Sequence, residues 1–336
     1  MPFRIRVSLI VLGLLATSVL LLPLLWPVPP LSDTEPVREL ATNDATWIET
    51  GPLALHAHLA GPTASEVDET DAGNDVPAPI AFVHGFGSSL ASFHRVQEPW
   101  SQARITIAYD RPGFGLTERP LNVRDPSPYG PDAQVDQLLA VLDRLGSEPA
   151  VIVGHSAGAS IALQAALVHP DRIRALVLVA PALDGSGGAP RSARWLLRTP
   201  QAQRIGPLLM RQVGGRSGEG LLRGGYADPS RIGPEVLEAH RTASRAHDWD
   251  RALWEVVLAA RPPDLDGRLR DLDLPVLVVI GEQDAIVPPD QSERAAEAIP
   301  GATVVRLDGC GHVVQEECPE RLVDAANAWL DAPDGR

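Results

Sequence analysis

The chain has 336 residues, of which 44% are hydrophobic and 21% charged, and its formal net charge is −14. This composition excludes a disordered polyelectrolyte and allows one large domain with an insertion, or two domains. The acidic balance, without a long basic run, argues against nucleic acid as a partner, because phosphate binding needs clustered positive charge. The two cysteines, Cys310 and Cys318, exclude a disulfide-rich scaffold, and no cysteine or histidine cluster has the spacing of a zinc site.

An uncharged run over residues 7–26 follows Arg4 and Arg6. Twenty helical residues span about 30 Å, the thickness of the hydrocarbon core of a bilayer. Because the run ends without a small-residue cleavage site, it favours an uncleaved signal anchor over a removed signal peptide, the alternative that would give a secreted protein. We therefore predict a transmembrane segment over 1–30, a Pro-rich linker over 31–44 and, by the positive-inside rule, an extracytoplasmic location for the rest.

Eight short apolar stretches are typical of buried strands, and helical patterns follow most of them. The predicted strands are 46–50, 53–59, 79–83, 104–109, 150–153, 174–180, 275–280 and 303–307. The predicted helices between and after them are 89–102, 131–145, 159–167, 290–299 and 319–330. The first two strands form a hairpin, and the alternation that follows predicts a mostly parallel sheet of eight strands with helices on both faces.

Two features near the first strands could be metal sites, but neither has a complete set of ligands. His56 and His58 fall on the same face of a strand, but no third metal ligand is evident, so we expect a solvated face. Residues 64–78 are acidic but lack the spacing of an EF-hand calcium loop, and we interpret them as a surface insertion.

The segment between Ala182 and Leu274 has no strand pattern and is too long for a plain connection. Helical patterns cover 193–213 and 234–260, and a Gly-rich connector over 213–225 lies between them. A helical cap inserted into the sheet domain would explain this pattern. The predicted domains are a core of residues 45–182 and 274–332 and a cap of residues 183–273.

Residues 154–158, Gly-His-Ser-Ala-Gly, lie between a predicted strand and a predicted helix. A serine at this turn, with a glycine two positions away on each side, is typical of a nucleophile elbow. Side chains beside the serine would collide in so tight a turn, so both flanking positions need glycine. We expect Ser156 in a strained backbone conformation with its hydroxyl exposed.

A serine hydroxyl becomes a nucleophile when a histidine removes its proton and a carboxylate orients that histidine. His312 lies in a Gly-rich loop after the last strand, where active sites of α/β sheets collect. His169 ends a helix, and His240 and His247 lie in the cap, where a solvated histidine is expected. The sequence therefore predicts His312 as the base.

Asp284, which follows the strand at 275–280, is the predicted acid. Its competitors are the neighbouring Glu282 and Asp184, which follows the strand at 174–180. The tetrahedral intermediate also needs two N–H donors. We predict the amide of Ala157, at the start of the helix after the elbow, and the amide of Phe86, in the loop after the strand at 79–83.

Five motifs in this order resemble the α/β-hydrolase superfamily, in the branch with an inserted helical cap. They are His-Gly-Phe-Gly at 84–87, Asp-Arg-Pro-Gly-Phe-Gly at 110–115, Gly-His-Ser-Ala-Gly at 154–158, Gly-Glu-Gln-Asp-Ala-Ile-Val-Pro at 281–288, and Gly311-His312 with Glu317 and Pro319. Serine at the elbow argues against the epoxide hydrolases and haloalkane dehalogenases, which carry aspartate there. In this family Asp110 and Gly113 belong to a structural turn, and His84 is interpreted as structural too.

The resemblance implies a serine hydrolase that cleaves carboxylic esters through an acyl-enzyme, without a metal or organic cofactor. The alternatives are hydrolysis of a carbon–carbon bond, perhydrolysis, and a binding protein that keeps the scaffold without catalysis. Trp195, Trp249 and Trp254 in the cap suit either an apolar substrate or packing of cap against core. Cys310 and Cys318 could form a disulfide that braces the histidine loop, although family members often carry the first cysteine without a partner. The oligomeric state stays open.

Overall fold

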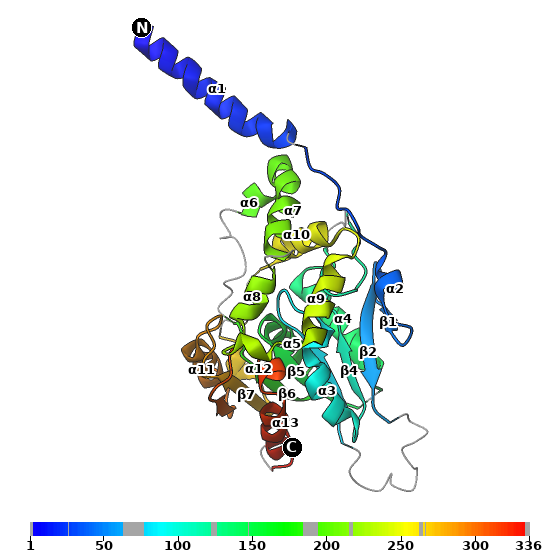
Figure 1. Cartoon of the computed structure of the whole chain (residues 1–336). Coiled ribbons are helices and arrows are strands. Elements are labelled where there is room, and N and C mark those ends of the chain that lie inside the picture. The colour runs from blue at the N-terminus through cyan, green and yellow to red at the C-terminus, as the bar shows by residue number, and fades with distance from the viewer. Residues whose placement is uncertain are drawn as a thin grey trace.

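The computed structural model contains one sheet of eight strands with helices on both faces (Figure 1). It describes residues 3–25, 27–62, 77–121, 126–146, 148–183, 194–214, 218–261, 265 and 267–332. The strands are β1 (Thr46–Glu49), β2 (Ala54–Ala60), β3 (Ile80–Val83), β4 (Thr106–Tyr109), β5 (Ala150–His155), β6 (Ile173–Val179), β7 (Val276–Gly281) and β8 (Thr303–Leu307). All eight predicted strands are present, and the bounds differ by no more than a few residues.

The strands lie side by side in the order β1-β2-β4-β3-β5-β6-β7-β8. The β1–β2 and β2–β4 pairs are antiparallel, and the remaining five pairs are parallel. The predicted mostly parallel sheet is confirmed. Because the parallel strands end at one edge, the loops that follow β3, β5, β7 and β8 gather there.

Helices cover both faces of the sheet, as its apolar strands require. They are α3 (His94–Ser101), α4 (Pro131–Asp143), α5 (Ala157–Val168), α11 (Pro289–Glu297), α12 (Val314–Glu317) and α13 (Pro319–Leu330), with 3₁₀ turns η1 (Leu90–Phe93), η2 (Pro170–Arg172), η3 (Pro229–Arg231) and η4 (Leu269–Asp271). Alternate residues of β5 point to opposite faces. Ile152 belongs to the core shared with α4 and α5, whereas Val151 and Val153 belong to the core shared with α3 and α13. This double burial explains why the strand is apolar throughout.

The cap consists of helices between β6 and β7, which lie above the sheet in Figure 1. They are α6 (Arg194–Leu197), α7 (Pro200–Gly214), α8 (Gly218–Gly224), α9 (Pro234–Ser244) and α10 (Trp249–Ala259). Within the predicted Gly-rich connector, residues 218–224 form a helix, α8. Helix α8 contacts α7, although glycine has a low helix propensity, and its Leu221 and Leu222 line a cavity.

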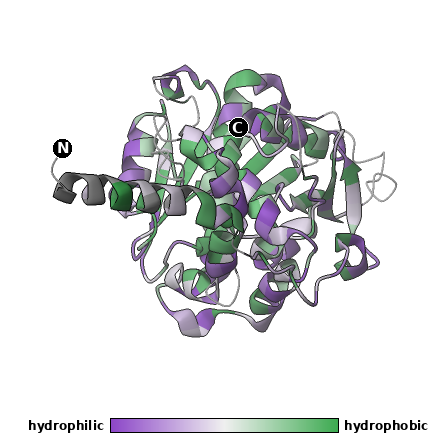
Figure 2. Ribbon diagram, turned by 90° about the horizontal axis from the view of Figure 1, so that it is seen from above, coloured by the Kyte–Doolittle hydropathy of each residue, from purple (hydrophilic) through white to green (hydrophobic). Residues whose placement is uncertain are grey.

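Helix α1 (Phe3–Leu25) projects away from the rest of the chain (Figures 1 and 2). Within the part of the chain that the structure describes, no helix combines the length and apolar character needed to cross a bilayer. The predicted transmembrane anchor, the membrane partner and the membrane-anchored extracytoplasmic location are therefore wrong.

Part of the segment after α1 is bonded to the cap. We call residues 29–35 the N-terminal strap. The amide of Glu35 donates to the carbonyl of Arg245 at 2.8 Å, and the amide of His247 donates to the carbonyl of Glu35 at 2.9 Å. The Arg211 guanidinium donates to the carbonyl of Pro29 at 2.8 Å. The chain then forms the short helix α2 (Val37–Leu40) before it enters β1.

Candidate active site

Ser156 occupies a strained turn between β5 and α5. Its φ of 52° and ψ of −120° lie in a region that non-glycine residues rarely adopt. A Cβ at Gly154 would lie 2.8 Å from the Cα of Ala159, and a Cβ at Gly158 would lie 2.1 Å from the carbonyl oxygen of Val83. Both contacts are with backbone atoms, so the flanking positions have room for glycine alone.

His312 and Asp284 form a buried pair at the same edge of the sheet. The Nδ1 atom of His312 lies 2.8 Å from the Oδ2 atom of Asp284. The other carboxylate oxygen, Oδ1, accepts hydrogen bonds from the amides of Ile286 and Val287, both at 2.8 Å. Since an ionised carboxylate only accepts hydrogen bonds, the pair holds the proton of His312 on Nδ1 and leaves Nε2 as the basic atom.

The structure separates Asp284 from its nearest competitor. Glu282, two residues earlier, has an exposed side chain, whereas Asp284 is 6% exposed. Asp184 lies outside the described residues. Among the three histidines set aside above, His169 is half-buried at the end of α5, His247 is exposed, and His240 lines the same cavity as Ser156 and His312.

The loop after β3 approaches the elbow from the side. A Cβ at Gly85 would lie 3.0 Å from the Cβ of Ser156, so Phe86, the next residue, lies beside the serine. Ala157 is the first residue of α5, where the helix dipole favours negative charge. Both predicted oxyanion donors thus belong to backbone segments that adjoin Ser156.

His84 has a structural part in this loop. Its Nε2 atom accepts a hydrogen bond from the amide of Arg111 at 2.9 Å, and its Nδ1 atom donates to the carbonyl of Gly85 at 2.8 Å. Burial, and secondarily the charge of Arg111, lower the pKa of His84 to about 4. The imidazole is therefore neutral at pH 7 and ties two loops of the site together.

The prediction that His56 lies on a solvated strand face is wrong. The His56 side chain is buried, and its Nδ1 atom lies 2.7 Å from the Oδ2 atom of Asp110. Burial acts to raise the pKa of Asp110, but the bonds from His56 and from the amide of Leu90 outweigh it and lower that pKa. His58 contacts Gln97 instead, with 3.1 Å between Nδ1 and Oε1. Over the described residues, no group of three or more side chains is suited to a metal ion.

A cavity of about 220 Å³ lies between the elbow and the cap. Ser156 and His312 line it from below, together with Phe86, and leucine and valine side chains of the cap line it from above. The described lining residues include no tryptophan. A Cβ at Gly206 would lie 2.2 Å from the Trp254 ring, and one at Gly214 would lie 2.5 Å from the Trp249 ring, so these rings pack inside the cap.

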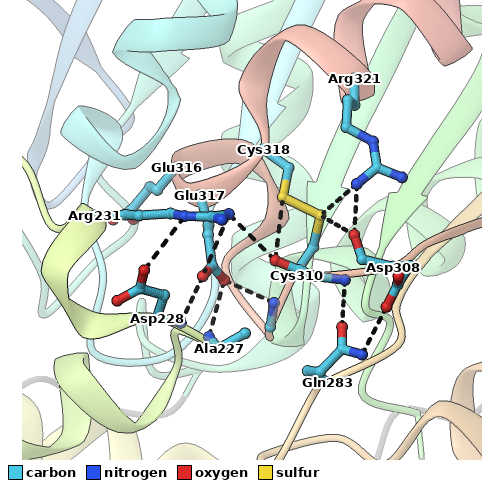
Figure 3. The surroundings of a disulfide bond; sticks show 12 residues. Ala227, Asp228, Arg231, Gln283, Asp308, Cys310, Glu316, Glu317, Cys318 and Arg321 are labelled. Carbon is cyan, nitrogen blue, oxygen red and sulfur yellow. Dashed lines mark hydrogen bonds and ion pairs between the residues drawn. A yellow bond between two sulfur atoms is a disulfide. The ribbon is translucent and has the colours of Figure 1, made fainter.

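The histidine loop is braced by a disulfide and by a buried carboxylate (Figure 3). Cys310 and Cys318 are joined by a disulfide, the pairing that the sequence left open. Glu317 accepts hydrogen bonds from the amide of Gly311 at 2.7 Å and from the amides of Ala227 and Asp228 at 3.0 and 2.8 Å. Glu317 thus connects the loop before His312 to the cap segment that follows α8.

The cap also holds the backbone of His312 itself. The carbonyl of Gly225 accepts hydrogen bonds from the amide of His312 at 2.7 Å and from the amide of Val313 at 3.2 Å. Any shift of this cap segment would therefore move the predicted base.

Sequence reasoning missed two further residues that line this cavity. His155 donates from Nε2 to the carbonyl of His312 at 3.1 Å, and its ring centroid lies 4.7 Å from that of His312. Burial, followed by the neighbouring His312, lowers the pKa of His155. Glu316 accepts hydrogen bonds from Ser92 and Tyr226, and burial raises its pKa. His155 stands inside the elbow motif, and Glu316 is one helical turn after His312, so position relative to these motifs was the available signal.

Comparisons with known proteins identify the family to which the chain belongs. A 2-hydroxymuconate semialdehyde hydrolase of Pseudomonas sp. (strain CF600) is 30% identical over 271 residues, which cover 76% of this chain and 88% of that protein. The dihydrolipoyllysine-residue acetyltransferase component of an acetoin cleaving system of Pseudomonas putida is 28% identical over 77% of this chain, but the match spans only 65% of that protein.

Among solved structures, a thermophilic esterase from Thermogutta terrifontis, with malate bound, superposes with a TM-score of 0.67 and 25% identity. That match covers 85% of this chain and 97% of the esterase chain. The profile of the alpha/beta hydrolase family matches residues 80–325, from β3 into α13. The chain therefore belongs to the alpha/beta hydrolase family.

Proposed function

We propose that this protein hydrolyses carboxylic esters, with Ser156 as nucleophile, His312 as base and Asp284 as the group that orients the base. The observation that carries the proposal is the 2.8 Å hydrogen bond between His312 and Asp284 at the cavity that the strained Ser156 also lines. These are the three groups that acyl transfer through a serine needs.

The reaction follows from these positions. The Oγ atom of Ser156 attacks the ester carbonyl while Nε2 of His312 takes the hydroxyl proton. The amides of Phe86 and Ala157 stabilise the oxyanion that forms. Collapse of the intermediate breaks the bond to the alcohol, which leaves with the proton from His312. Water, activated by the same histidine, then releases the acid from Ser156.

Replacement of Ser156 by alanine tests the assignment. Ser156→Ala should abolish turnover of p-nitrophenyl esters, and a fluorophosphonate probe should add one adduct to the wild type and none to this variant. Ser160→Ala, at a serine one turn further along α5, is the matched control and should still be labelled. Wild-type rates in Ser156→Ala would overturn the proposal, and a wild type that neither reacts with the probe nor cleaves esters would favour a binding protein.

Hydrolysis of a carbon–carbon bond is the second candidate, because the relative from strain CF600 is named for 2-hydroxymuconate semialdehyde. That substrate carries a carboxylate. Of the described residues that line the cavity, none is an arginine or lysine, and Glu316 contributes a carboxyl group of its own. We therefore expect esters to be cleaved with a higher kcat/KM than 2-hydroxymuconate semialdehyde when both are offered to one enzyme preparation. The reverse order would select the second candidate.

A further inference from the structure

Four apolar residues that line the cavity are also exposed on the surface of the molecule. Phe86, Val213, Leu221 and Ile286 all belong to the cavity lining, and each is between 41% and 48% exposed. A residue that both lines a cavity and faces solvent lies where the cavity opens. These four residues, which we call the apolar rim, therefore mark the mouth of the cavity.

The rim is shared between the cap and two loops of the core. A Cβ at Gly87, the residue after Phe86, would lie 3.9 Å from the Cδ2 atom of Leu221. A Cβ at Gly225, the residue after α8, would lie 3.7 Å from the Cδ1 atom of Ile286. Helix α8 and its end therefore lie close to the loops that follow β3 and β7.

The polar groups of the cavity lie deeper than the rim. Ser156, His312 and Glu316 are buried. Within the part of the lining that the structure describes, the exposed residues are the four of the rim and Gly87, and none of them has a polar side chain. An apolar surface in water gains free energy when an apolar group covers it. A ligand that extends from Ser156 to the rim should therefore be apolar at its outer end.

The size of the cavity decides which ligands reach the rim. Its volume of about 220 Å³ lies below the about 300–1,000 Å³ of pockets that bury most of a drug-sized ligand. An ester too long for this space has to continue through the mouth, where it passes over the rim. Exposed apolar groups around a concave site are typical of ligand-binding grooves.

We infer that the apolar rim is an outer binding site for the acyl chain of a long-chain carboxylic ester, whose carbonyl lies at Ser156 and whose far end contacts Val213 and Leu221. This inference rests on the proposed ester hydrolysis and adds a substrate class to it. We assign the acyl chain and not the alcohol because the acyl group stays bonded to Ser156 after the alcohol leaves. Contacts at the rim then stabilise the transition states of both steps.

The chain-length profile is the first test. The substrates are the p-nitrophenyl esters of butanoic, hexanoic, octanoic and decanoic acid, each below its critical micelle concentration. In the wild type, kcat/KM should rise through the decanoate, by about twofold for each methylene that the rim covers on one side. A profile that is flat or falls beyond the hexanoate would show that the cavity closes around the chain, and would overturn the inference.

Replacement of two rim residues of the cap tests the site itself. The double variant Val213→Thr with Leu221→Gln should lower kcat/KM for the decanoate about tenfold, because two half-exposed side chains no longer offer the chain an apolar contact. It should leave the butanoate within a factor of about two, since a chain of four carbons ends inside the cavity. Leu221→Met keeps an apolar side chain and should keep the wild-type profile.

Leu209→Gln is the matched control, because Leu209 is an exposed leucine of cap helix α7 that does not line the cavity. It should keep the wild-type profile. Equal losses on the butanoate and the decanoate in the double variant would show that the rim does not act on the chain, and would overturn the inference. A rise in rate from hexyl to decyl acetate without a rise along the acyl series would overturn the assignment to the acyl chain.

Binding separates this inference from the proposed function. Calorimetry with Ser156→Ala should show tighter binding of methyl octanoate than of methyl butanoate, and the added changes at Val213 and Leu221 should reduce the difference. This result would support an outer site for the chain even if the wild type cleaved no ester. Equal binding of the two esters to Ser156→Ala would contradict the inference whether or not the wild type is an esterase.

Discussion

Both carboxylate oxygens of Asp284 have hydrogen-bond partners. One oxygen faces His312, and the other accepts the amides of Ile286 and Val287. An asparagine at this position would have to turn its NH₂ group either toward two amide donors or toward Nδ1 of the histidine. The first arrangement is repulsive, and the second favours the wrong tautomer of the base.

We therefore predict that Asp284→Asn lowers kcat for a p-nitrophenyl ester by about 10³- to 10⁴-fold, with a much smaller change in KM. Steady-state kinetics on the purified variant measures both. Glu282→Gln is the control, because the Glu282 side chain is exposed, and it should keep wild-type kinetics. A wild-type kcat in Asp284→Asn would mean that another carboxylate orients the base.

The choice between these two carboxylates shows the limit of sequence reasoning at this scale. Glu282 and Asp284 both follow β7 within three residues, and the geometry of the turn buries Asp284 and exposes Glu282. The burial of His56 was missed for a similar reason, since its partner Asp110 lies 54 positions away in the chain. The elbow, in contrast, was predictable because its glycines and strained serine are local requirements.

At the scale of elements, the histidine loop depends on three separate attachments. These are the disulfide, the Glu317 carboxylate and the carbonyl of Gly225. The disulfide closes a loop with a sequence separation of 8, and a loop of this length contributes about 2.5 kcal/mol through the entropy of the unfolded chain. The other two attachments do not depend on oxidation.

Reduction should therefore reduce stability more than activity. We predict that dithiothreitol lowers the free energy of unfolding in urea by about 2 kcal/mol and leaves kcat/KM at 25 °C within a factor of about two. The variant with both cysteines replaced by alanine should match the reduced protein and should not respond to dithiothreitol. An unchanged unfolding curve on reduction would show that the bond adds nothing to the stability of the fold.

An ion pair between α7 and α10 of the cap includes the arginine that also binds the N-terminal strap. Arg211 lies 2.7 Å from Asp250, whose side chain is 2% exposed, and the same guanidinium bonds the carbonyl of Pro29. Loss of the arginine would leave a buried carboxylate without its counter-charge. We predict that Arg211→Met lowers the free energy of unfolding by about 3 kcal/mol, measured in urea. Arg172→Met, at an exposed pair with Asp143, should cost less than about 1 kcal/mol, and equal costs would contradict the argument.

The sheet was predictable because each strand satisfies one local rule, an apolar run bounded by turn residues. Helix α8 was not, since its sequence is rich in glycine, which has a low helix propensity.

For the molecule as a whole, buried neutral histidines couple stability to pH. His84 and His155 both have lowered pKa values because burial disfavours their charged forms. The unfolded chain takes up a proton at each near pH 6.5, whereas folded His84 does so only near pH 4. Between these values the unfolded state binds more protons, so stability rises with pH and is lost as pH falls. Glu316, with its raised pKa, acts in the opposite direction, since its contribution is lost as pH rises.

We predict that the free energy of unfolding in urea falls by about 3 kcal/mol from His84 alone as the pH is lowered from 6.5 to 4. His84→Gln retains an acceptor for the amide of Arg111 and a donor for the carbonyl of Gly85 but cannot be protonated in this range. Its slope of stability against pH should therefore be lower by up to about 1.4 kcal/mol per pH unit. His247→Gln, at an exposed histidine of the cap, is the control and should keep the wild-type slope. Identical slopes in the wild type and His84→Gln would mean that acid sensitivity arises elsewhere, with His155 as the next histidine to replace.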